Sequence, residues 1–291
     1  RKVRRDSRDQ VWQATIYKKS DVRDHYNEMT LEFKEFSLTF RAYDDGVAYR
    51  FASKLKGDFT VMSETAEFAF AKDWDAFIPY VKQHTKTLET QYFNSFENTY
   101  KEHRLSEWNK ARLAFAPLVV NADNGVKVLL TEADLLDYPG MFLYNYKKGT
   151  GETLSGYFAR VPDDVEIGGH NMVQEMVNSR KDYIAECKPG AEFPWRVIAV
   201  ASSDKELTDS DIVWKLATPA SDTDWSWVRP GKVAWEWWNA WNLKGVDFET
   251  GVNDETYRHY IDFAAENGIE YVILDEGWAV NLEADLLKVV P

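Results

Sequence analysis

The stretch "KVAWEWWNAW" at residues 232–241 holds four tryptophans within seven positions, with one glutamate and one asparagine among them. Its first seven residues, "KVAWEWW", have the pattern of a β-strand. Buried strands are usually filled with Val, Ile or Leu, so the large rings need a separate explanation. We expect some rings to seal the packing face of this strand and others to wall a ligand pocket at its end, because flat apolar rings serve both purposes.

The residues that follow predict a helix and a second strand. Helical spacing runs through "NDETYRHYIDFAAENG" at 253–268, where Asn253 or Asp254 can cap the start and Gly268 suits the stop. The residues on that helical stripe are Tyr257, Tyr260, Ile261 and Ala264. The next stretch, "IEYVILDEGW" at 269–278, is a continuous apolar strand. Strand, helix and apolar strand form a βαβ unit, which implies a parallel sheet.

The N-terminal part has the pattern of antiparallel strands. In "LEFKEFSLTFRAYDDGVAYRF" at 31–51, two alternating runs flank Asp44-Asp45-Gly46, and Asp-Gly between such runs is a strong hairpin signal. We expect Phe36, Leu38 and Phe40 to share one face of the first strand, and Val47, Tyr49 and Phe51 to share one face of the second.

Further strands are predicted over 67–71, on both sides of Asn124-Gly125 within 113–135, and over 193–203, while 74–107 is expected to hold turns or short helices. The predicted fold is therefore a mainly β N-terminal super-sandwich followed by the first βαβ unit of a (β/α)8 TIM barrel.

The pattern changes at Pro230-Gly231, which predicts an N-terminal sandwich domain over 1–230 and the beginning of a barrel over 231–291. A (β/α)8 barrel needs roughly 250 residues, so we expect the barrel to be truncated at Pro291. The chain opens on "RKVRRDSRDQ" without Met, and we expect it to be an internal piece of a longer protein.

Composition narrows the classes of partner. The formal net charge of −13 disfavours nucleic acid and anionic membrane surfaces. No apolar run reaches the length of a membrane-spanning helix, so no membrane insertion is expected. Cys187 is the only cysteine and is expected to be an inert buried thiol. Aromatic residues make up 15% of the chain, which suits either carbohydrate contact or a ring-rich core.

In parallel α/β folds, functional side chains gather at the C-terminal ends of strands. That rule selects Asp275, Glu276 and Trp278 after the second predicted strand. Carboxylates accept hydrogen bonds that sugar hydroxyls can donate, and a Trp face stacks on a sugar ring. These three residues therefore predict a hexose-binding site. The alternative is that Asp275 caps a turn and Trp278 is part of the core.

Strand alternation predicts that Trp235 and Trp237 share one face of the first strand, while Glu236 and Trp238 share the other. Trp235 is expected to pack in the core. Trp237 and Trp241, closer to the strand end, are the candidates for ligand contact, with a core position as the alternative for each ring.

Several long stretches resemble glycoside hydrolase family 97, in the expected order and over nearly the whole chain. They are "VRDHYNEMTLEF" (22–33), "LLTEADLLDYPGMFL" (129–143), "FPWRV" (193–197) and "KVAWEWWNAWNLKGVDFETGVNDETYRHYIDFAAENGIEYVILDEGWA" (232–279). The resemblance implies an α-glucosidase or α-galactosidase with a galactose-mutarotase-like super-sandwich, a catalytic barrel and a C-terminal β-domain.

The resemblance also implies Ca²⁺, held near the active site by glutamates of the sandwich and the barrel. Glu28 in "HYNE" and Glu132 in "TEADL" are the candidate metal ligands, with solvated strand-end acids as the alternative. "IGGHN" could bring His170 and Asn171 to the same junction, although an ordinary turn is the simpler interpretation.

By analogy with related barrel α-galactosidases, Asp275 and Glu276 would bind the glycone and not break the bond. The nucleophile and the general acid are expected beyond Pro291. The hypothesis is thus a fragment of a calcium-dependent, exo-acting glycosidase that takes terminal α-linked glucose or galactose from oligosaccharides and is inactive by itself. The family implies a periplasmic or secreted location. Two alternatives stay open: a non-catalytic carbohydrate-binding sandwich, or a sandwich that only shapes the barrel entrance.

Overall fold

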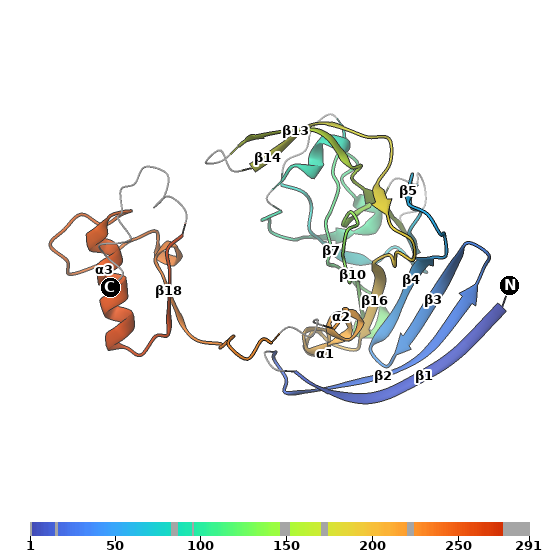
Figure 1. Ribbon diagram of the computed structural model, residues 1–291, viewed down its shortest axis with the longest axis horizontal. Coiled ribbons are helices and arrows are strands. Elements are labelled where there is room, and N and C mark those ends of the chain that lie inside the picture. The colour runs from blue at the N-terminus through green and yellow to red at the C-terminus, as the bar shows by residue number, and fades with distance from the viewer. Residues whose placement is uncertain are drawn as a thin grey trace. The chain divides into compact units, whose positions relative to one another are not determined.

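The computed structural model describes residues 2–14, 17–82, 87–94, 96–145, 152–169, 174–219 and 224–275 (Figure 1). The chain divides into two compact units, which are considered separately. The sandwich unit comprises Arg1–Ile167 and Glu175–Pro219, and the βαβ unit comprises Gly168–Gln174 and Ala220–Pro291. No helix in these ranges has the length and apolar character needed to cross a bilayer.

Most of the regular structure consists of strands. Their bounds are β1 (Lys2–Gln13), β2 (Asp21–Glu32), β3 (Phe36–Tyr43), β4 (Gly46–Ser53), β5 (Phe59–Val61), β6 (Glu67–Ala69), β7 (Asp75–Ile78), β8 (Lys101–Arg104), β9 (Leu118–Asn121), β10 (Lys127–Ala133), β11 (Met141–Tyr144), β12 (Thr153–Phe158), β13 (Pro162–Gly168), β14 (Gln174–Arg180), β15 (Ala185–Cys187), β16 (Trp195–Ala201), β17 (Val233–Trp235) and β18 (Tyr271–Ile273).

The helices are short apart from the last one. The α-helices are α1 (Asp204–Asp209), α2 (Ile212–Leu216) and α3 (Asp254–Glu266), and the 3-10 helices are η1 (Glu89–Tyr92), η2 (Leu105–Glu107), η3 (Asp123–Gly125) and η5 (Glu236–Asn239). The segment 74–107 therefore contains the predicted short helices, but it also contains β7 and β8.

A nine-stranded antiparallel sheet organises the sandwich unit, in the order β1-β2-β3-β4-β16-β10-β9-β7-β8. The β3–β4 hairpin turns at Asp44-Asp45 as predicted, and its register pairs Tyr43 with Gly46. Gly46 has φ +152°, and a Cβ there would lie 2.5 Å from the Ile198 carbonyl oxygen. The turn thus requires glycine for both its backbone angle and its close approach to β16.

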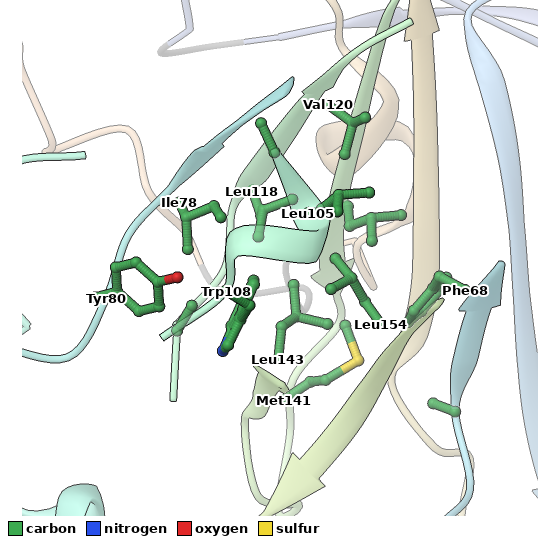
Figure 2. Packing of buried hydrophobic residues seen from close by; sticks show 14 of the residues in the cluster. Phe68, Ile78, Tyr80, Leu105, Trp108, Leu118, Val120, Met141, Leu143 and Leu154 are labelled. Atoms are coloured by element: carbon green, nitrogen blue, oxygen red, sulfur yellow. The ribbon is translucent and has the colours of Figure 1, made fainter. Parts of the chain in front are cut away.

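One face of this sheet packs on the three-stranded sheet β11-β12-β6, which makes the predicted sandwich. Figure 2 shows the buried side chains between the layers. They include Leu118, Val120 and Leu130 from the large sheet and Phe68, Met141, Leu143 and Leu154 from the small one. The super-sandwich prediction is confirmed.

The opposite face of the large sheet is covered by α1 and α2. Alternation along β16 sends Trp195, Val197 and Ala199 to this side, where they pack with Ile212 and Leu216 of α2. Cys187, on β15, is a free and buried thiol, as expected.

The βαβ unit has the predicted order and direction. Strands β17 and β18 are parallel, with Val233 paired to Tyr271 and Trp235 to Ile273. The Asn253 side chain caps α3 by accepting a hydrogen bond from the Thr256 N–H. This pairing is the part of the barrel that the described residues contain.

Both strands of this unit are shorter than predicted, and β18 covers only Tyr271–Ile273 of the described part of the 269–278 segment. The strand predicted over "KVAWEWW" ends at Trp235, and Glu236–Asn239 form the 3-10 helix η5. The Trp241 N–H donates to the Glu236 carbonyl oxygen at 2.9 Å, which closes the chain into this turn. The predicted two-face alternation of residues 235–238 is therefore wrong beyond Trp235.

Candidate functional site

The candidate site lies where β17 and β18 end. Parallel strands bring their carboxyl ends to one edge of a sheet, and loops at that edge carry function in α/β folds. Here β17 runs directly into η5, and Asp275 follows two residues after the end of β18. Residues 39 positions apart in the chain thereby come into contact, as the Asp275–Glu236 hydrogen bond shows.

Two consecutive residues hold Asp275. The Asp275 N–H donates to Glu236 Oε1 at 2.6 Å, and the Trp235 indole N–H donates to Asp275 Oδ2 at 2.6 Å. One contact fixes the backbone of Asp275 and the other fixes its carboxylate. A charge-assisted hydrogen bond of this kind is stronger than a neutral one, so the orientation of Asp275 is set before any ligand arrives.

Glu236 is an unusual side chain to find under this edge. It is only 1% exposed, and its Oε2 has no hydrogen-bond partner within the described part of the chain. Burying a carboxylate oxygen without a partner costs free energy. Burial of Glu236 therefore lowers the stability of the folded βαβ unit.

Two tyrosines of α3 lie near the same carboxylate. Tyr257 is fully buried, and burial together with the nearby Glu236 charge raises its pKa to about 12. The Trp241 indole lies close enough to oppose this rise in the pKa of Tyr257, but neither its N–H nor the Tyr257 hydroxyl has a hydrogen-bond partner within the described residues. The Tyr260 hydroxyl donates to Asn239 Oδ1 at 2.8 Å, which ties α3 to η5.

The turn η5 sets the directions of the tryptophans. Ala240 and Trp241 both adopt left-handed backbone angles, with φ +53° and +56°. That conformation is rare for a bulky residue and is a form of backbone strain found at functional sites. It brings the Trp241 ring to 4.6 Å from the Trp237 ring, centroid to centroid. Trp237 is 46% exposed and Trp241 is partly buried, so one ring of the pair is open to solvent at the strand end.

The structure places the sequence-predicted residues as follows. Asp275 lies at the strand end, and Trp237 and Trp241 lie together on η5 and the residues after it. Glu276 and Trp278 lie outside the described residues, as do His170 and Asn171. Sequence reasoning missed that Trp235, expected only to pack, is a hydrogen-bond donor to Asp275.

Each of the two predicted calcium ligands accepts a hydrogen bond from an arginine of the sandwich unit. Glu28 accepts a hydrogen bond from Arg41 Nε at 2.9 Å. Glu132 accepts from Arg196 Nη1 at 2.6 Å and from the Met141 N–H at 2.9 Å. Burial raises the pKa of Glu132, although these donors oppose the rise.

Glu28 and Glu132 also lie too far apart to share an ion. Strands β3, β4 and β16 separate β2 from β10, which is four strand spacings, or roughly 19 Å along the sheet. The register places Glu28 on the same face as Thr131, so Glu132 points to the opposite face. No cluster of three acidic, His or Cys side chains suited to a metal occurs among the described residues. These two residues do not fit a common calcium site.

Comparison with known families decides the relationship of the chain. Residues 1–219 match the family "Glycosyl-hydrolase 97 N-terminal", and residues 237–291 match "Glycoside hydrolase 97". The chain belongs to glycoside hydrolase family 97. The resemblance inferred from the sequence motifs is thereby confirmed.

Two curated relatives have similar sequences. The "Retaining alpha-galactosidase" of Bacteroides thetaiotaomicron is 50% identical over 288 residues, which is 98% of this chain and 43% of that protein. The "Probable retaining alpha-galactosidase" of Streptomyces bingchenggensis is 26% identical over 84% of this chain and 31% of that protein. The chain thus spans less than half the length of the curated relatives it matches.

Solved structures share the fold. A family 97 enzyme from Pseudoalteromonas sp. strain K8, in complex with acarbose, superposes with a TM-score of 0.71 at 24% identity, covering 96% of this chain and 40% of that one. A structure described as a beta-arabinopyranosidase superposes with a TM-score of 0.73 at 22% identity, covering 99% of this chain and 44% of that one. At these identities the likeness supports the fold alone.

Proposed function

We propose that this chain is part of an exo-acting glycoside hydrolase that removes terminal α-linked galactose from oligosaccharides. The observation that carries the proposal is the pre-oriented Asp275 at the strand end of a family 97 chain, where η5 also carries the exposed ring of Trp237 close to that of Trp241. The half-identical relative named as a retaining alpha-galactosidase favours galactose over glucose and retention over inversion.

The described residues would bind the sugar and not cleave it. Asp275 would accept hydrogen bonds from hydroxyls of the terminal ring, and Trp237 with Trp241 would offer an apolar surface to its C–H face. Glu276 and Trp278 are proposed for the same subsite. Glycosidases of this kind work with two carboxyl groups on either side of the bond, and we assign the nucleophile and the general acid to no residue of this chain.

The domain limits of 1–230 and 231–291 are part of this proposal, as is a periplasmic or secreted location, which rests on family resemblance only. A calcium requirement is also proposed on family resemblance only, because Glu28 and Glu132 do not form a common site that would support it. The non-catalytic sugar-binding alternative is not favoured, because the curated relatives carry the names of hydrolases.

Asp275→Ala, made in the complete protein that contains this chain, tests the proposal. With p-nitrophenyl α-galactoside we expect kcat/KM to fall by at least about 100-fold, because a pre-positioned hydroxyl contact is lost. Asp262→Ala, which removes an exposed carboxylate on α3, is the matched control and should leave kcat/KM unchanged. Wild-type kinetics for Asp275→Ala would remove Asp275 from the site, and a preference for p-nitrophenyl α-glucoside would overturn the choice of galactose. Activity that survives EDTA would remove the calcium requirement.

A further inference from the structure

We propose that Glu236 is a positioning residue that acts through Asp275, and this inference rests on the sugar-binding role proposed for Asp275. The strand ladder explains why such a residue is needed. The last register pair of β17 and β18 joins Trp235 to Ile273, so the Asp275 N–H lies beyond the reach of the ladder. The Glu236 carboxylate accepts this N–H in place of a strand partner.

Burial indicates that this contact has a purpose. Water could satisfy the Asp275 N–H at an exposed position. Here a buried carboxylate accepts it instead: Glu236 is 1% exposed, and its Oε2 has no partner within the described residues. The free-energy cost of burying that oxygen is expected to be offset by a gain elsewhere. The gain we infer is a fixed Asp275, because misplacement of a binding group by about 1 Å can reduce catalysis about 100-fold.

Trp235 completes the arrangement from the neighbouring position. Its indole N–H holds Asp275 Oδ2, so Glu236 fixes the main chain and Trp235 fixes the side chain of one residue. Side chains that bind ligands reach their working geometry when neighbouring hydrogen bonds lock them. Two supports from adjacent positions of β17 and η5 thus converge on Asp275.

The other end of the same strand pair supplies a matched control. There, Glu270 Oε2 accepts a hydrogen bond from the Lys232 N–H at 2.8 Å, which is the same type of contact between the same two segments. Glu270 is exposed and lies before β18, at the edge opposite to Asp275. Loss of the Glu270 carboxylate should therefore affect the strand pair without affecting sugar binding.

A double-mutant cycle in the complete protein tests the proposal, with kcat/KM for p-nitrophenyl α-galactoside and Ki for free galactose as readouts. We expect Glu236→Ala alone to lower kcat/KM about 100-fold and to weaken galactose by a similar factor. In the Asp275→Ala background the same change should cost less than about threefold, since residues that act through one another are not additive. Glu270→Ala should stay within about twofold of wild type, because the contact that it removes is remote from the site.

Glu236→Gln keeps the inference testable if the alanine variant does not fold. One amide oxygen can still accept the Asp275 N–H, so we expect Glu236→Gln to retain most of the galactose affinity that Glu236→Ala loses. Additive losses for Glu236 and Asp275, or a Glu236→Gln variant as impaired as Asp275→Ala, would overturn the positioning role. The single variant Asp275→Ala tests the proposed sugar-binding role separately. If this variant had wild-type kinetics, the proposed role of Asp275 would be wrong, whatever the coupling to Glu236.

Discussion

The two units bury carboxylates in opposite ways. In the sandwich unit, Arg196 is 1% exposed and forms ion pairs with both Glu64 and Glu132, at 2.7 and 2.6 Å. In the βαβ unit, Glu236 is equally buried, yet no cation lies within ion-pair distance of it among the described residues. In the first arrangement every carboxylate oxygen accepts a hydrogen bond, with one cation shared by the two acids. In the second arrangement Glu236 Oε2 lacks a hydrogen-bond partner among the described residues, as expected of a site that has still to receive other groups.

The largest effect is expected from breaking the complete arrangement. Arg196→Met removes the cation shared by Glu64 and Glu132 and leaves two buried carboxylates uncompensated. We expect the sandwich to lose about 3–5 kcal/mol in free energy of unfolding at pH 7. The loss should shrink as the pH falls, because each carboxylate would then have a raised pKa in the folded state and can neutralise itself by binding a proton. Urea unfolding at pH 7 and pH 5 measures both effects.

Arg23→Met is the control for this substitution. Arg23 pairs with Asp9 through two hydrogen bonds, but both side chains are more than half exposed. Exposed pairs are screened by water, so its removal should change the unfolding midpoint little. Equal losses for Arg196 and Arg23 would show that burial is not what distinguishes the Arg196 network.

Local signals allowed much of the fold to be predicted from the sequence. The Asp45-Gly46 hairpin and the α3 helix were both identified, with Asn253 as one of two candidate caps, because turn chemistry and capping act over a few neighbouring residues. The end of β17 was not identified. The turn after Trp235 coincides with a contact between Glu236 and Asp275, and a contact between residues so far apart in sequence leaves no local pattern.

The edge of the sandwich could not be predicted for a different reason. Strand β1 (Lys2–Gln13) is almost wholly exposed and rich in charge, so it shows no alternation of apolar residues. It pairs along its length with β2, and charge on an exposed edge strand discourages further pairing. The candidate site was found in part: strand-end reasoning located Asp275, whereas the supports at Trp235 and Glu236 needed coordinates.

An intermediate effect is expected from two tyrosine hydroxyls, one in each unit. The Tyr138 hydroxyl donates to Glu64 Oε2 at 2.9 Å within the Arg196 network. The Tyr257 hydroxyl is buried without a hydrogen-bond partner in the described part of the chain. We expect Tyr138→Phe to cost about 1.5–3 kcal/mol, because a bond to a charged acceptor is lost, and Tyr257→Phe to be neutral or slightly stabilising.

Thermal unfolding of the two phenylalanine variants in the complete protein compares them directly. A marked loss of stability for Tyr257→Phe would mean that its hydroxyl finds a donor or acceptor in the folded protein. The βαβ unit would then be better satisfied than its described residues indicate, and the contrast between the units would weaken.

The smallest effect is expected where a carboxylate is paired but still reaches solvent. Asp211 forms an ion pair with Lys19 at 2.6 Å and accepts the Tyr17 hydroxyl at 2.9 Å. Burial alone would raise the pKa of Asp211, but these donors hold it below its ordinary value of 3.8. A lowered folded pKa adds stability above the unfolded pKa, and this stability is lost as the pH falls through the folded value. Asp211→Asn should therefore cost at most about 1 kcal/mol at pH 7 and less at pH 3, which lies below the ordinary pKa of 3.8.

Urea midpoints at both pH values check this expectation, with Asp163→Asn on the exposed face of β13 as the control. A penalty for Asp211→Asn that does not shrink between pH 7 and pH 3 would show that the amide fails for a reason of shape and not of charge. A penalty at pH 7 as large as that of Arg196→Met would mean that water screens the Asp211 ion pair no better than it screens the Arg196 network. Differences in solvent access would then fail to explain why the ion pairs of the sandwich unit differ in strength.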